Sequence, residues 1–266
     1  MRDRPPRSAP DWNPEQYNRF RDERARPFYD LIDLVELRPA MRAVDLGCGT
    51  GELTRELHHR VDARETIGID SSPAMLAESD AFAGDGLSFR EGDIAAFPAT
   101  PDVGTFDLLF SNAALHWLPD HEALLARLAQ SLTPSGQMAV QVPANHDHPS
   151  HLIAAAVAAE SPFREALAGY TRQSPVLAPE AYAALLDRLG FAAQTVRLQV
   201  YGHHLAGREE VIEWVRGTLL TDYEKRLPAE LWPRFLDRYQ ERLLPELTDT
   251  HPYFYPFKRI LFWATR

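Results

Sequence analysis

A glycine-rich turn between a predicted strand and a predicted helix constrains this chain more than any other feature. The strand-like run Val44–Leu46 is followed by Gly47, Gly49 and Gly51 on alternate positions, and a helix-forming run begins at Glu52. Glycines at such a turn let backbone N–H groups approach a ligand closely, and the helix N-terminus adds further donors. The turn therefore predicts the ligand-binding crevice of an open αβ sheet.

The residues around this turn indicate which kind of nucleoside it binds. The next strand-like run ends at Asp70, an acidic residue placed to hold the two hydroxyls of a ribose. A dinucleotide fingerprint requires its third glycine at position 52, which is Glu52, and Asp45 would repel a pyrophosphate. The same carboxylate would attract an ammonium group. S-adenosylmethionine, which carries an ammonium and a nucleoside but no phosphate, fits this pattern.

Predicted strands and helices alternate along most of the chain. Strands are expected at about 42–46, 66–70, 87–90, 106–110, 137–142, 192–201 and 260–264. Helices are expected at about 12–35, 52–60, 120–132 and 179–191, with another starting at Ser71-Ser72-Pro73. This alternation predicts an α/β fold with a doubly wound, mostly parallel, seven-stranded sheet.

Three segments fall outside the predicted sheet: about 1–35, 143–178 and 205–250. The last of them contains two helical stretches, 208–219 and 229–247. Two of these segments follow predicted strands, so they are placed to lie near the strand ends, where open αβ sheets bind ligands. We therefore expect residues 1–266 to form a single domain whose extra segments make a helical cap.

Composition excludes several classes of partner. The 266 residues carry a formal net charge of −10, which argues against binding nucleic acid phosphates over a broad surface. No run of apolar residues is long enough for a transmembrane helix, and the N-terminus lacks the apolar core of a secretory signal. We expect no membrane partner and a cytoplasmic location, which the single cysteine, Cys48, also favours. The oligomeric state stays open.

The stretch Val-Asp-Leu-Gly-Cys-Gly-Thr-Gly at 44–51 resembles the first motif of class I S-adenosylmethionine-dependent methyltransferases. The resemblance implies that the turn holds the methionine end of the cofactor, and that residues at the following strand ends hold its ribose and adenine. The cofactor-binding residues so implied are Asp45, Gly47, Cys48, Gly49, Gly51, Asp70, Ser71, Met75, Asp93, Ile94, Asn112 and Ala113. Cys48 is expected to be a small packed residue rather than a nucleophile.

A closer resemblance spans nearly the whole chain. Residues 12–20, 24–27, 68–76, 112–121, 141–145 and 254–259 are similar to motifs of trans-aconitate 2-methyltransferases. This implies esterification of one carboxylate of a small polycarboxylic acid, with trans-aconitate as the favoured substrate. Arginine binds carboxylates through two parallel hydrogen bonds, and tyrosine can donate another. The expected substrate-binding residues are Tyr17, Arg26, Trp117, Tyr255 and Arg259.

Histidines offer two further possibilities. His116 is the best-placed candidate for a general base, but a carboxylate is already anionic at pH 7 and needs none, and His116 with Trp117 fits equally a role in shaping the pocket. The group His146, His148 and His151 superficially resembles a metal site. It lies in a segment without cysteine partners, so we expect a polar loop and no bound metal.

Other functions remain open at this point. The nearest alternative is a methyltransferase for another small acid, an acyl-carrier-bound acid or a natural product. A non-catalytic cofactor-binding protein is a second alternative, since binding residues alone do not prove turnover. A nicotinamide-dependent oxidoreductase is a third, against which Asp45 and Glu52 both count.

Overall fold

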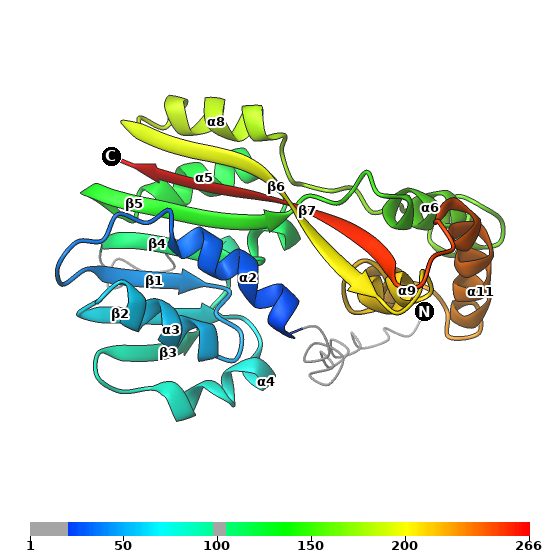
Figure 1. The fold of residues 1–266 in the computed structure, drawn as a ribbon, viewed down its shortest axis with the longest axis horizontal. Coiled ribbons are helices and arrows are strands. Elements are labelled where there is room, and N and C mark those ends of the chain that lie inside the picture. Colours follow the sequence, from blue (N-terminus) through cyan, green and yellow to red (C-terminus); the bar gives the residue numbers. More distant parts are fainter. Residues whose placement is uncertain (1–20, 98–104) are drawn as a thin grey trace, which may run out of the picture. The chain divides into compact units, whose positions relative to one another are not determined.

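The computed structural model describes residues 21–97 and 105–266, and its central feature is a seven-stranded sheet (Figure 1). The strands lie in the order β3-β2-β1-β4-β5-β7-β6, and β7 runs antiparallel to β5 whereas the pairings from β3 to β5 are parallel. The order confirms the predicted doubly wound sheet. Its bounds are β1 Arg42–Leu46, β2 Glu65–Asp70, β3 Leu87–Glu91, β4 Phe106–Asn112, β5 Leu132–Pro143, β6 Ala193–Leu205 and β7 Tyr253–Thr265.

The helices begin where the local sequence favours a start. Gly51 precedes α3 with a φ of 83°, and the Ser72 side chain accepts a hydrogen bond from the Met75 N–H at the start of α4. Pro179 occupies the first turn of α8, as prolines often do. The helices are α2 Arg21–Ile32, α3 Glu52–Arg60, α4 Pro73–Leu76, α5 His121–Ala129, α6 Pro149–Ala158, α7 Phe163–Ala166, α8 Pro179–Arg188, α9 Glu210–Val215, α10 Thr221–Arg226 and α11 Trp232–Leu243.

The sheet is apolar on both faces. Along β5, Ala139 packs in one cluster with Phe28 and Leu31 of α2, whereas Met138 and Val140 pack in the other with residues of α5 and α8. Successive side chains of a strand point to opposite faces, so this alternation assigns α2 to one side of the sheet and α5 with α8 to the other. Helices therefore cover both faces, as a parallel sheet requires.

The chain divides into two compact units. The larger one comprises 22–145, 174–201 and 256–266 and contains most of the sheet; the smaller one includes 146–173 and 202–255. The smaller unit has its own aromatic core, in which Phe235 stacks on Tyr223 with ring centroids 5.3 Å apart and meets the Phe163 ring edge-on at 5.3 Å. A cap over the crevice stays a prediction. Residues 22–35, which we included in it, instead group with the sheet.

Several boundaries differ from the expected ones. Strand β5 begins at Leu132 rather than at the expected position 137, and its pairing with β4 shifts register between Phe106 and Leu108. Such a bulge lets Pro and Gly lie inside a strand. The expected helix 208–219 is α9 followed by a π-helical turn at 216–220 and then α10. Expected helix residues 12–20 lie outside the described ranges.

Candidate cofactor and substrate site

The glycine turn after β1 has the geometry that the sequence predicts. Gly47, Gly49 and Gly51 have φ angles of 82°, 57° and 83°, a region that residues with a side chain rarely adopt. A Cβ atom added at Gly47 would lie 2.2 Å from the Cβ of Ala114, so the loop after β4 closes on this turn. The N–H groups of Gly47 and Cys48 donate to the Ile69 carbonyl at 2.7 and 3.1 Å. These bonds hold the turn against β2.

Asp70 connects the glycine turn after β1 with the start of the loop after β2. One carboxylate oxygen accepts the Gly49 N–H at 2.9 Å, and the other accepts the Ser72 N–H at 2.9 Å. Each carboxylate oxygen has a second acceptor direction. Because Asp70 stands at the carboxyl end of β2, its remaining acceptor capacity suits the two hydroxyls of a ribose.

Asp45 lies beneath the same turn and is buried. Its Oδ2 accepts a hydrogen bond from the Thr54 hydroxyl at 2.7 Å. Burial raises the pKa of Asp45 to about 7, the Thr54 hydrogen bond opposes this, and the charge of Asp70 adds to it. A carboxyl poised near neutrality beside a ligand crevice would ionise when a cation such as an ammonium group binds nearby.

The residues expected around the adenine occupy the next loops. Asp93 is exposed, and its Oδ1 accepts the Ala95 N–H at 2.8 Å, which caps the short turn Ile94–Ala96. Ile94 is buried, Ser71 is exposed, and the Met75 methyl group lies 3.1 Å from where a Gly49 Cβ would be. Burial raises the pKa of the Cys48 thiol, which agrees with a packed rather than a nucleophilic cysteine.

The neighbouring strands β4 and β5 carry two side chains with buried polar atoms, Asn112 and Gln141. Asn112 is the last residue of β4, and its buried Oδ1 accepts no hydrogen bond from any residue in the described part of the chain. Ala113 follows with a φ of 55° and donates its N–H to the Gln141 carbonyl at 2.9 Å. Gln141 was not among the site residues predicted from the sequence. Its signal was a glutamine inside the apolar run Met138–Val142 of a central strand.

The expected substrate-binding residues fall in different places. Arg259 is 6% exposed, and its Nη1 donates to Oε1 of Gln141 at 3.5 Å. Arg26 is exposed near the Tyr201 ring, and Trp117 is 49% exposed with its ring centroid 4.7 Å from that of His116. Tyr17 lies outside the described ranges. The positions of these residues do not test whether they bind the substrate, so their substrate-binding roles stay predictions.

Tyr255 belongs to the smaller unit, where it is buried. Its ring lies edge-on to those of His148 and Trp214, with centroids 5.0 and 5.6 Å apart. The Ser150 hydroxyl lies 2.9 Å from Nδ1 of His148 and 3.1 Å from Nδ1 of His151. Burial, followed by the charge of nearby Arg172, lowers the pKa of His151 to about 3, so this imidazole is neutral at pH 7.

Two kinds of feature are absent from the described residues. No three His, Cys, Asp or Glu side chains within 21–97 and 105–266 are grouped to hold a metal ion. Over the same residues, no helix combines the length and apolar character needed to cross a bilayer.

Similarity to known proteins agrees with this site. A trans-aconitate 2-methyltransferase from Deinococcus radiodurans is 49% identical over 261 residues, which cover 96% of this chain and 98% of that protein. The chain belongs to the trans-aconitate 2-methyltransferase family. Residues 44–140, which run from β1 to β5, match the family model described as a methyltransferase domain. That segment contains all the expected cofactor-binding residues, from Asp45 to Ala113.

Solved structures confirm the fold of this family member. The YcgJ protein from Bacillus subtilis superposes with a TM-score of 0.60 at 18% identity, covering 91% of this chain and 98% of that one. A phosphoethanolamine N-methyltransferase from Haemonchus contortus, solved with S-adenosyl-L-methionine, superposes with a TM-score of 0.51 at 15% identity. The alignment covers 91% of this chain and 52% of that one. At these identities the likeness establishes the architecture alone.

Proposed function

We propose that this protein is an S-adenosylmethionine-dependent O-methyltransferase that esterifies one carboxylate of trans-aconitate. The observation that carries the proposal is the 49% identity to a trans-aconitate 2-methyltransferase over nearly the full length of both chains. The site supports it independently. The turn, the acidic residues and the strand ends suit a ligand with an ammonium, a ribose and an adenine, and Asp45 disfavours a pyrophosphate.

The residues present fit the cofactor. Asp45 and the N–H groups of the turn would hold its methionine end, and Asp70 would accept hydrogen bonds from the ribose hydroxyls. The buried Oδ1 of Asn112, which has no donor within the part of the chain described, can accept from an ammonium group. Asp93 and Ile94 would hold the adenine edge, flanked by Ser71 and Met75. When bound, the cofactor supplies an electrophilic methyl group.

The chemistry asks little of the protein beyond alignment. The substrate carboxylate is anionic at pH 7, so it has no proton to lose before it accepts a methyl group. With the cofactor bound, the new C–O bond would form as the C–S bond breaks, and the electron pair would stay on sulfur. Proximity and orientation can supply several kcal/mol of such a barrier. The task of this chain is therefore to fix the acid in line with the methyl group and to exclude water.

Binding experiments test the cofactor part of the proposal. Calorimetry should detect S-adenosylmethionine and its demethylated product, and Asp70→Ala should weaken both strongly because the turn loses the carboxylate that joins it to β2. Asp187→Ala, in the last turn of α8, is a matched control that should bind normally. Binding of NAD in place of the sulfonium cofactor would contradict the proposal.

A further inference from the structure

A row of polar side chains crosses three strands on one face of the sheet. Asn112 of β4 is paired with Gln141 of β5, and β7 runs beside β5 with Arg259 opposite Pro143. Two residues back along each strand toward the middle of the sheet, Phe110, Ala139 and Leu261 all pack in the cluster that contains α2. Because residues two apart point to the same face, Asn112, Gln141 and Arg259 share the α2 face.

This row lies next to the cofactor turn. The Gln141 carbonyl accepts the Ala113 N–H at 2.9 Å, and Ala114 is the residue that approaches Gly47. The strand order of the sheet reverses between β1 and β4, and open αβ sheets bind ligands at such a point. The glycine turn follows β1 on one side of this point, and the polar row lies on β4, β5 and β7 on the other side.

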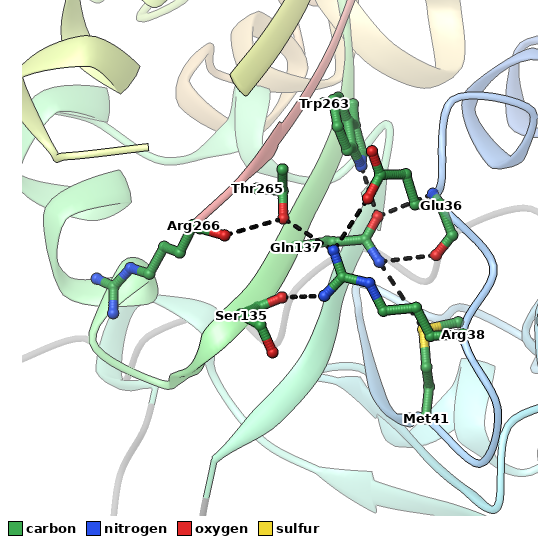
Figure 2. Close-up of polar contacts among 8 residues, drawn as sticks. All are labelled: Glu36, Arg38, Met41, Ser135, Gln137, Trp263, Thr265 and Arg266. Atoms are coloured by element: carbon green, nitrogen blue, oxygen red, sulfur yellow. Dashed lines mark hydrogen bonds and ion pairs between the residues drawn. The ribbon is translucent and has the colours of Figure 1, made fainter. Parts of the chain in front are cut away.

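Two glutamines of β5 on this face have opposite environments. Gln137 and Gln141 are both fully buried. Figure 2 shows that Gln137 is saturated: its Nε2 donates to the Glu36 carbonyl at 2.8 Å, and its Oε1 accepts from Trp263 Nε1 at 2.7 Å and from the Glu36 N–H at 2.9 Å. Gln141 Nε2 is buried but donates to no acceptor within residues 21–97 and 105–266.

The orientation of the Gln141 amide follows from its neighbour. A guanidinium has only donors, so the atom that meets Arg259 Nη1 at 3.5 Å must be the oxygen. The group without a partner in the described residues is therefore the NH₂ group, Nε2. Buried donors in native proteins are nearly always satisfied, and an exception calls for a reason such as an absent ligand.

We infer that Gln141 is a substrate-binding residue, whose Nε2 donates to a non-reacting carboxylate of the acid. This inference rests on the proposed function. Gln141 and Arg259 present donors from neighbouring strands, a combination that suits a planar carboxylate. A site built around such donors rejects an analogue that lacks the carboxylate, because its buried donor is then left unpaired. Gln141 thereby helps to select polycarboxylates over simpler acids.

Gln141→Met tests this inference, with Gln137→Met as the matched control. Methionine has a similar volume and no amide donor. Gln141→Met should raise KM for trans-aconitate roughly 10- to 100-fold, the value of a charge-assisted hydrogen bond, because the contact is equal in ground and transition states. Its kcat, its Kd for S-adenosylmethionine and its Tm should stay near wild type, since the side-chain hydrogen bond that is lost, from Arg259 Nη1 to Oε1, is a long one of 3.5 Å.

Gln137→Met should do the reverse: Tm falls because the hydrogen bonds to Glu36 and Trp263 are lost, while KM stays unchanged. Gln141→Glu places a carboxylate beside Arg259 and should raise KM more than Gln141→Met does. If the wild-type enzyme is active and Gln141→Met has an unchanged KM, the inference about Gln141 is wrong but the proposed function stands. The same holds if Gln141→Met fails to fold. A wild-type protein that methylates no polycarboxylate overturns the proposed function as well.

Discussion

At the scale of single residues, Asp45 links cofactor binding to pH. Its carboxyl is buried, and its pKa is raised to about 7, mainly by burial. An acid with a raised pKa binds its proton more tightly in the folded state than in the unfolded one. Its contribution to stability is therefore full below the unfolded pKa of about 4 and is lost as pH rises toward 7. An ammonium ligand favours the ionised form.

We therefore expect the affinity for S-adenosylmethionine to increase as pH rises from about 6 to 8. Calorimetry near pH 7 in buffers of different ionisation enthalpy should detect release of part of a proton on binding. Asp45→Asn, which cannot ionise, should bind S-adenosylmethionine more weakly than the wild type. Its affinity should also lack the increase with pH that ionisation of Asp45 causes. A wild-type affinity that is flat between these pH values would contradict the role of Asp45.

His116 should matter little to the chemical step. A carboxylate nucleophile has no proton to lose, so His116→Ala should lower kcat by far less than the roughly 10²–10⁴-fold typical of a lost general base. Steady-state rates between pH 6 and 9 measure this. A collapse of activity that recovers at high pH would indicate a hydroxyl or amine nucleophile and one of the alternative substrates.

At the scale of elements, α2 is an integral part of the sheet domain. Phe28 is 1% exposed and meets the Phe110 ring edge-on, with centroids 5.3 Å apart. Phe28→Ala should lower the free energy of unfolding by about 3–5 kcal/mol, the usual cost of a large cavity in a core. Denaturant titration measures the loss. Leu37→Ala, at a side chain 65% exposed, is the control and should change stability by less than about 0.5 kcal/mol.

Residues 1–20 precede α2, which spans Arg21–Ile32, and they can be deleted as a unit. If the N-terminal segment contributes to the predicted cap and to the substrate site through Tyr17, deleting 1–20 should abolish methyl transfer. The far-ultraviolet circular dichroism and the binding of S-adenosylmethionine should persist, since the turn and the sheet remain. Full activity of this deletion would remove the segment from the site.

At the scale of the whole molecule, the sequence predicts what local patterns encode. The bounds of β1 and α3 and the glycine turn follow from apolar runs, helix starts and backbone needs. The bulge in β5 does not, because it is a shift in the pairing with β4, a strand distant in sequence. The π-helical turn after α9 does not either, because the local bond from the Thr221 hydroxyl to the Arg216 carbonyl leaves no mark in the apolar periodicity. Gln141 was missed for a related reason: that its Nε2 has no acceptor within the described residues is visible only once its neighbours on β4 and β7 are in place.

Methyl transfer from S-adenosylmethionine to a polycarboxylic acid can be measured directly. Purified protein is incubated with S-adenosylmethionine and trans-aconitate, with cis-aconitate, citrate and isocitrate as comparators, and the products are identified by mass spectrometry. We expect a monomethyl ester of trans-aconitate, formed in equal amount with S-adenosylhomocysteine and faster than any product of the other acids. Binding of S-adenosylmethionine without a methyl ester of any of the four acids would contradict it.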